Sequence, residues 1–175
     1  MTAIGLLNHK LIKSIICSDC NDEALRIANQ NLKLLTISGI NERINHLENL
    51  FSQFIKTSHL QAIESAKTLR KLIDKDRNIN TIIFNSDIFK SNDTDRKNIK
   101  ADIIFTDIPY GNLVSWQNDE DIDINILLDN LMPVIKTDSI IAICSNKRQK
   151  IHSGNYIRLE KEQIGKRKFE IFTLR

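Results

Sequence analysis

The sequence lacks any apolar run long enough to cross a membrane, and its 175 residues include only three cysteines and two prolines. A small, odd number of cysteines argues against a disulfide framework and fits a reducing cytoplasm. The first residues show neither the charged start nor the cleavage site of a signal peptide. We therefore expect a cytoplasmic protein with no membrane partner.

Metal-ligand spacing is also missing from the sequence. Cys17 and Cys20 have the spacing of half a zinc site, but no second pair follows and Cys144 stands alone. The four histidines include no pair at i, i+4 spacing. We therefore predict packed thiols and no metal site.

The composition that remains is ordinary for a globular protein, with 41% hydrophobic and 27% charged residues. The chain has the length of one domain and shows no internal repeat, low-complexity tract or linker. We predict a single domain over residues 1–175 and expect a monomer.

Charge is distributed unevenly along the chain. Residues 145–175 carry nine Lys/Arg against three Glu, whereas the rest carries 16 basic and 19 acidic residues. A charge run is usually a solvated surface, but these clusters are compact, which favours a site that binds a polyanion such as RNA. The candidate phosphate contacts are Lys147, Arg148, Lys150, Lys166, Arg167 and Lys168.

Short apolar, β-branched runs alternate with helical patterns. The runs lie at residues 14–17, 81–84, 102–106 and 139–144, and each is typical of a strand buried on both faces. The last 20 residues alternate polar and apolar side chains over 156–163 and 168–174, which predicts a closing antiparallel pair. The pattern predicts one α/β sheet with right-handed crossovers.

Two helical stretches separate the first two strands. We expect Asp22 to cap a helix that Gly39 ends. Residues 41–76 are helical by periodicity and form an insertion, since a minimal α/β unit needs only a short loop here. The insertion could be a lid, a partner surface or additional packing.

Three predicted strands are followed by a carboxylate, at Asp19, Asp87 and Asp107. Open α/β sheets bind ligands at the carboxyl ends of their strands, so three such residues would form a row of acceptors for ribose hydroxyls and an adenine amine. Asp107 is followed by the rigid Pro109 and the aromatic Tyr110. Taken alone, this segment could equally be a strand that ends in an ordinary turn.

The motifs together resemble the AviRa family of rRNA methyltransferases, which are class I S-adenosylmethionine-dependent enzymes with a Rossmann-like sheet. The most specific part is DIIFTDIPYGNLVSW at residues 102–116. Further matches are GLLNHKLIKSIICSDCNDEALRIANQNLKLLT at 5–36, SHLQAIESAKTLRKL at 58–72, NSDIF at 85–89 and KEQIGKRKFEIFTLR at 161–175.

The resemblance implies a role for each site residue. Asp19 would bind the ribose of S-adenosylmethionine, and Asp87 with the backbone of Ile88 would hold its adenine. Residues 107–110 would be a version of the Asn/Asp-Pro-Pro-Tyr motif of amino-methyltransferases, with Ile108 in place of one proline. Asp107 would hold an exocyclic amine of guanine in rRNA while Tyr110 stacks on the base. Pro109 would stiffen the catalytic loop, and Trp116 would form a wall of the base pocket.

The first strand and glycine-rich loop of class I methyltransferases are not found here, because all five glycines are isolated. We therefore expect an N-terminally truncated sheet without its first strand, and poor binding of S-adenosylmethionine by this polypeptide alone. The resemblance leaves two functions open: an rRNA guanine methyltransferase, or a methyltransferase relic that binds RNA or another partner without catalysis. A DNA adenine or cytosine methyltransferase shares the Asp-x-Pro-Tyr logic and is disfavoured by the helical insertion and the tail.

Overall fold

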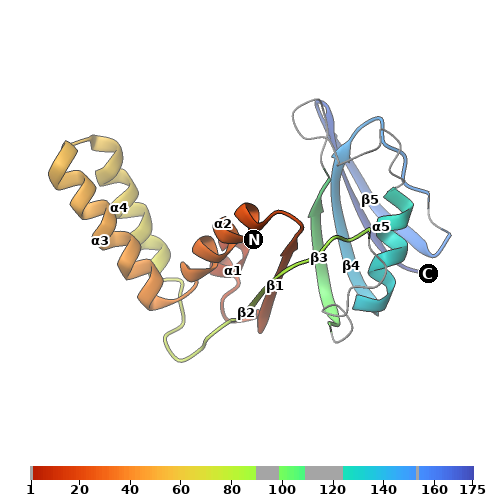
Figure 1. Cartoon of the computed structure of the whole chain (residues 1–175), viewed down its shortest axis with the longest axis horizontal. Helices are drawn as coiled ribbons and strands as arrows, with labels where there is room; N and C mark the ends of the chain where they lie inside the picture. The colour runs from red at the N-terminus through yellow and green to blue at the C-terminus, as the bar shows by residue number, and fades with distance from the viewer. Residues whose placement is uncertain (1, 90–98, 109–123, 153) are drawn as a thin grey trace. The chain divides into compact units, whose positions relative to one another are not determined.

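The computed structural model describes the chain apart from residues 1, 90–98, 109–123 and 153. Contacts group the chain into two compact units, Met1–Ser86 and Asp87–Arg175, although the sequence shows no linker between them (Figure 1). Each unit has its own buried hydrophobic cluster. Among the described residues, no helix is both long and apolar enough to span a membrane.

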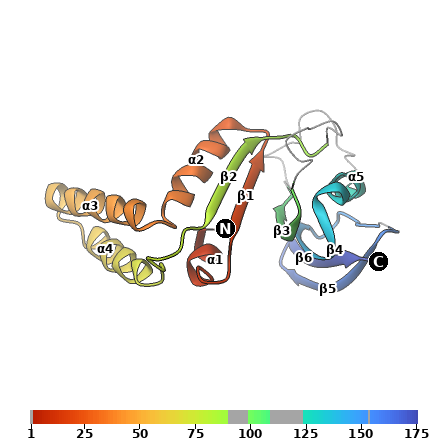
Figure 2. The same cartoon turned by 90° about the horizontal axis from the view of Figure 1, so that it is seen from below.

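The first unit combines a parallel strand pair with four helices. Its elements are α1 (Thr2–Leu7), β1 (Ser14–Asp19), α2 (Asp22–Lys33), α3 (Ile37–Phe54), α4 (Thr57–Arg70) and β2 (Asn80–Asn85). β1 and β2 pair in parallel from Ser14↔Asn80 to Asp19↔Asn85, so both strands end at the same edge. α2 lies along this pair, while α3 and α4 form an antiparallel hairpin that extends away from it (Figure 2). The hairpin is the predicted helical insertion, which begins at Ile37 rather than at residue 41.

Two predicted helix boundaries are wrong. Asn21, not Asp22, is the N-cap of α2, and its side chain accepts hydrogen bonds from the N–H groups of Glu23 and Ala24. Gly39 does not end α2, which stops at Lys33, but lies in the first turn of α3. A Cβ at residue 39 would lie 2.1 Å from the carbonyl oxygen of Lys33. The glycine therefore permits a tight passage between two helices.

The second unit is a four-stranded mixed sheet covered by one helix. Its elements are β3 (Ala101–Asp107), α5 (Ile124–Leu131), the 3₁₀ helix η2 (Met132–Val134), β4 (Ile135–Asn146), β5 (Tyr156–Ile164) and β6 (Arg167–Leu174). The strand order is β3-β4-β6-β5, with β3 parallel to β4 and the other pairs antiparallel. The predicted closing antiparallel pair is thus confirmed.

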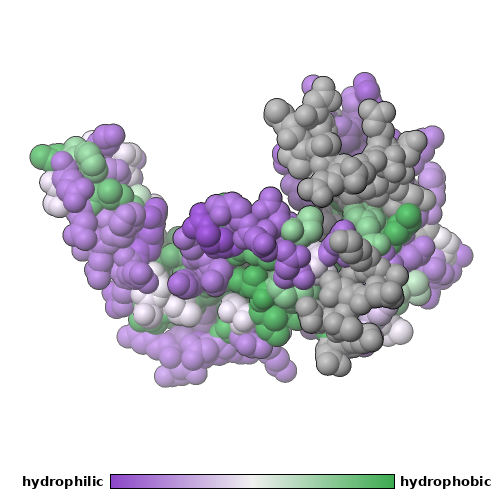
Figure 3. All heavy atoms as spheres, viewed as in Figure 1, coloured by the Kyte–Doolittle hydropathy of each residue, from purple (hydrophilic) through white to green (hydrophobic). Residues whose placement is uncertain are grey.

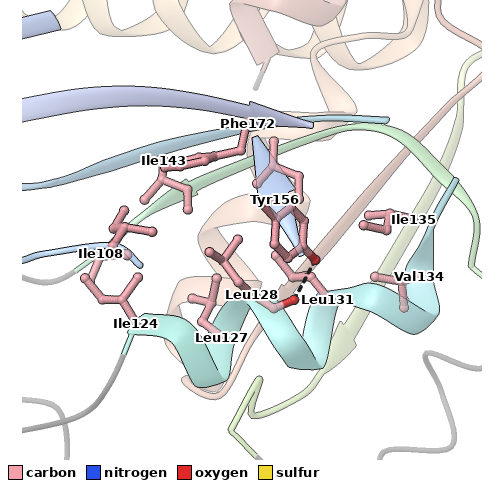
Figure 4. Close-up of a cluster of buried hydrophobic side chains, with 12 residues drawn as sticks. Ile108, Ile124, Leu127, Leu128, Leu131, Val134, Ile135, Ile143, Tyr156 and Phe172 are labelled. Atoms are coloured by element: carbon pink, nitrogen blue, oxygen red, sulfur yellow. Dashed lines mark hydrogen bonds between the residues drawn. The ribbon is translucent and has the colours of Figure 1, made fainter. Parts of the chain in front are cut away.

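One face of this sheet packs against α5. The fully buried Leu128 of α5 meets Ile141 and Ile143 of β4, and Phe172 of β6 completes the layer (Figure 4). Burying each of these side chains stabilises the unit by about 1.5–3 kcal/mol. The hydroxyl of Tyr156 donates to the carbonyl oxygen of Leu128 at 2.7 Å, which satisfies the one polar atom that β5 brings into this core.

The mixed α/β class is as expected. The described strands form a two-stranded sheet, β1-β2, in the first unit and a four-stranded sheet, β3-β4-β6-β5, in the second. Hydrophobic periodicity predicts that a segment is a strand, but it does not predict which strand lies beside it.

Candidate active site at the carboxyl ends of the strands

Asp107 ends β3 beside the last residues of β4. Its register partner is Cys144, and the N–H of Ile108 donates to the Cys144 carbonyl oxygen at 2.8 Å. The Ile108 side chain is 1% exposed in the hydrophobic cluster, whereas Asp107 is exposed. The buried isoleucine and the backbone hydrogen bond therefore fix the point at which the Asp107 carboxylate leaves the sheet. Pro109, Tyr110 and Trp116, which follow it, lie outside the described residues.

Cys144 lies opposite Asp107 in the register of β3 and β4. Burial, followed by the nearby Asp107 carboxylate, raises the pKa of Cys144 to about 11. The thiol is therefore protonated at neutral pH and is not a nucleophile. Sequence reasoning set Cys144 aside as a lone cysteine and missed this pairing. Only the strand register places it next to Asp107.

The segment after β2 carries Asp87 and Ile88. The Asp87 Oδ1 atom accepts the N–H of Phe89 at 3.0 Å, and Asn130 of α5 donates its side-chain amide to the Ile88 carbonyl oxygen at 2.8 Å. The Ile88 and Phe89 side chains pack against the buried cluster of the second unit. Asn130, which the sequence did not single out, therefore fixes the backbone that is expected to hold adenine.

Asp19 ends β1 in the first unit. Its Oδ1 atom accepts the N–H of Asn21 at 2.8 Å, and its carbonyl oxygen accepts the N–H of Ser86 at 3.1 Å. Asn85, at the end of β2, donates to Asp22 Oδ1 at 2.6 Å. These bonds join the ends of the two parallel strands and hold one oxygen of an exposed carboxylate by the backbone. Asp19 belongs to one unit and Asp87 and Asp107 to the other, so the expected row of three carboxylates stays a prediction.

The two basic clusters of the C-terminal region lie side by side. The N–H of Lys147, in the turn after β4, donates to the carbonyl oxygen of Lys166 at 3.0 Å. Gly165 (φ +61°) and Lys166 form a two-residue hairpin turn between β5 and β6, for which glycine at the first position is favoured. We call the exposed side chains of these two turns and their flanks the basic turn surface: Lys147, Arg148, Lys150, Lys166 and Arg167.

The basic turn surface lies close to Asp107 along the sheet. Lys147 is three residues beyond Cys144, the register partner of Asp107. At about 3.3 Å per residue along a strand, the separation is roughly 10 Å, less than the span of two nucleotides in an extended RNA strand. The basic turn surface and the Asp107 carboxylate are therefore near each other on the same sheet.

Lys168 differs from the other basic candidates because it is buried. It is 3% exposed, and its Nζ atom forms an ion pair with Oε2 of Glu170, which is 1% exposed. The contact is close in distance but is not aligned as a hydrogen bond, whereas Arg158 donates to the other oxygen, Oε1, at 3.0 Å. β6 is turned so that Lys168, Glu170 and Phe172 face α5, which leaves Phe169 partly exposed. We therefore leave Lys168 out of the basic turn surface.

The residues present fit S-adenosylmethionine in the chemistry of their donors and acceptors. An exposed carboxylate fixed by a backbone N–H at the end of a parallel strand suits two ribose hydroxyls, as Asp19 is arranged. The Asp87–Phe89 turn, held from two sides, presents a rigid edge of the kind that binds an adenine ring. Among the described residues, no group of three or more His, Cys, Asp or Glu side chains is placed to hold a metal ion.

The sheet with helices and acidic strand ends defines a class I methyltransferase fold. The family model described as rRNA methyltransferase AviRa matches residues 1–167, and the chain belongs to this family.

Relatives that match include proteins from Streptomyces viridochromogenes. A protein described as 23S rRNA (guanine(2535)-N(1))-methyltransferase is 27% identical over 176 residues, which cover 95% of this chain and 68% of that protein. Two crystal structures of rRNA methyltransferase AviRa superpose with TM-scores of 0.82 and 0.84 at 27% and 26% identity. The superposed regions cover 97% and 98% of this chain and 70% of each matched chain.

The description of the relative differs from one expectation drawn from the resemblance. We expected the family to act on an exocyclic amine of guanine, whereas the relative is described as acting on the ring nitrogen N1. The two atoms are neighbours on the same edge of the base, and both carry hydrogen.

Proposed function

We propose that this chain methylates a guanine of large-subunit rRNA with S-adenosylmethionine as the methyl donor. The observation that supports this most is Asp107, an exposed carboxylate fixed by Ile108 and Cys144 close to the basic turn surface. The description of the relative suggests the RNA and the base.

Asp107 is suited to accept hydrogen from the Watson–Crick edge of guanine. S-adenosylmethionine, when bound, supplies an electrophilic methyl group on a sulfonium. Methylation at N1 would replace the N1–H bond by an N1–CH₃ bond as the methyl–sulfur bond breaks and the neutral thioether leaves, and the Asp107 carboxylate would take the proton. Methylation of the exocyclic amine would use the same carboxylate to hold one N–H. We favour N1, because the relative is described by that position.

The remaining residues would position the two substrates. Asp19 would bind the ribose, and Asp87 with the Ile88 backbone would bind the adenine. Tyr110 would stack on the flipped guanine, and Pro109 and Trp116 would shape its pocket. The basic turn surface would hold the phosphates that flank it.

The test uses the purified chain, labelled S-adenosylmethionine and large-subunit rRNA transcribed without modifications. After digestion to nucleosides, chromatography separates 1-methylguanosine from N2-methylguanosine. We expect labelled 1-methylguanosine from the wild type and none from Asp107→Ala. Asp102→Asn is the matched control, because Asp102 is an exposed carboxylate at the other end of β3, where it contacts Lys136 at 2.5 Å.

Each part of the proposal has an outcome that contradicts it. Full activity of Asp107→Ala would remove the assigned role of this carboxylate. Labelled N2-methylguanosine would correct the target atom. RNA binding without any methyl transfer would favour the non-catalytic alternative.

A further inference from the structure

The free end of the α3–α4 hairpin combines an exposed aromatic ring, an exposed aliphatic side chain and a cation. Phe54 ends α3 and is 57% exposed, and Ile55 follows it at 77% exposure. Lys56 places its Nζ atom 5.8 Å from the centre of the Phe54 ring, and His59 meets that ring edge-on with centroids 6.3 Å apart. We call Phe54, Ile55, Lys56 and His59 the hairpin tip. Apolar residues gather at this end of the hairpin in Figure 3.

Ile55 is in a backbone conformation that isoleucine disfavours. Its φ is +51° and its ψ is +35°, in the left-handed region, and among the described residues it is the only non-glycine with positive φ. Glycine usually occupies this position at the end of a helix, because a branched Cβ clashes with the backbone there. The exposed Ile55 side chain gains little burial in return. Folding of the hairpin therefore does not account for isoleucine at this position.

The charge of the hairpin tip favours a polyanion over a protein surface of mixed charge. From residue 49 to residue 63 the chain contains no Asp or Glu, and it contains Lys56, His59 and several hydroxyl and amide side chains. The nearest acids are Glu48, which pairs with Lys67, and Glu64. An aromatic ring beside a cation, with no carboxylate nearby, is the chemistry that binds single-stranded nucleic acid through stacking and phosphate contact.

We propose that the hairpin tip binds an unpaired segment of the rRNA substrate other than the target guanine. A base stacks on the exposed part of the Phe54 ring and packs against Ile55, and Lys56 contacts a flanking phosphate. The hairpin then acts as a second RNA-binding element that selects the substrate without taking part in methyl transfer. This inference rests on the proposed function, because it concerns the same RNA.

The experiment compares steady-state methylation of unmodified large-subunit rRNA by three proteins. The tip variant carries Phe54→Ala, Ile55→Gly and Lys56→Ala. The control variant carries Leu69→Ala and Arg70→Ala, which remove one apolar and one basic side chain at the other end of α4. We expect the tip variant to raise KM for rRNA about tenfold, as the loss of one stacked base does, with kcat within about twofold of the wild type. The control variant should leave both parameters unchanged.

The single substitution Ile55→Gly separates binding from folding. Because it relieves the left-handed strain, we expect a higher melting temperature together with weaker rRNA binding. A merely structural role of Ile55 would move stability and binding in the same direction.

Several outcomes would overturn the inference while leaving the proposed function intact. The inference fails if the tip variant has an unchanged KM for protein-free rRNA. It also fails if the variant is defective only on intact large ribosomal subunits, since that result would indicate a ribosomal protein as the partner. If the wild type transferred no methyl group, the proposed function would fail, and filter binding of rRNA without cofactor would still show whether the tip variant binds more weakly.

Discussion

Asp107 and Cys144 lie opposite each other in the register of β3 and β4, and the charge of Asp107 helps to raise the pKa of the Cys144 thiol. Asp107 is the proposed catalytic residue, and Cys144 belongs to the neighbouring strand β4. Because the pKa of Cys144 is raised to about 11, the thiol keeps its proton over the whole physiological range. We infer that this thiol donates a hydrogen bond to the Asp107 carboxylate and that Cys144 is a positioning residue for Asp107.

The first prediction replaces the thiol. Cys144→Val removes the donor at similar volume, and we expect kcat to fall roughly tenfold or more, because a hydrogen bond to a charged group is worth about 1.5–3 kcal/mol. KM for rRNA should stay unchanged, since the phosphate contacts are intact. Cys144→Ser keeps a donor and should restore most of the rate. Equal activity of the valine and serine variants would show that the contact does not position Asp107.

The second prediction concerns the buried Lys168–Glu170 pair. Lys168→Met leaves the Glu170 carboxylate buried with Arg158 alone, and breaking a buried pair in this way destabilises by up to about 3–5 kcal/mol. Urea unfolding should show this loss, and Lys168→Met with Glu170→Leu should recover part of it. The control Lys150→Met removes an exposed cation and should leave stability within about 0.5 kcal/mol. A Lys168→Met variant as stable as the wild type would indicate that the pair contributes nothing to folding.

These two contacts show where sequence reasoning reaches its limit in this chain. The apolar runs were sufficient to predict most strands and the acidic residues at their ends. The pairing of Asp107 with Cys144 depends on register between distant segments, which periodicity does not determine. In β6, alternation favours an inward Phe169, yet the structure turns Lys168 and Glu170 inward, where the two opposite charges form an ion pair and Arg158 also contacts the carboxylate.

The third prediction uses salt to count the phosphate contacts of the basic turn surface. Lys147→Ala, Arg148→Ala and Lys150→Ala together should weaken rRNA binding in low salt. They should also reduce the slope of log K against log salt concentration by roughly 0.7 for each lost contact to single-stranded RNA. Filter binding at several salt concentrations between about 50 and about 300 mM KCl measures the slope, because screening increases over this range. Lys136→Ala is the control, because Lys136 lies near the opposite end of β4. An unchanged slope would place the RNA elsewhere.

The last prediction concerns stability in alkaline solution. Burial raises the pKa of Cys144 to about 11, and burial together with the charge of Asp129 raises that of Tyr156 to about 12. Both groups are neutral when protonated, so the folded state holds their protons more tightly than the unfolded state does. Their stabilising contribution is complete below their ordinary pKa values of 9.0 and 10.0, and it is lost as pH rises through the folded values.

The free energy of unfolding, measured in urea, should therefore fall steadily between pH 9 and pH 12, a window set by these pKa values. Tyr156→Phe tests the assignment because it deletes one titrating group. At pH 8, a value about two units below the ordinary pKa of tyrosine, it should lower stability by about 0.5–1.5 kcal/mol through loss of the hydrogen bond to the Leu128 carbonyl oxygen. Because the variant no longer titrates at this position, its stability should fall less steeply than that of the wild type above pH 10. Parallel curves for the two proteins would mean that another group drives alkaline unfolding, since the buried phenol would then contribute nothing to the pH dependence.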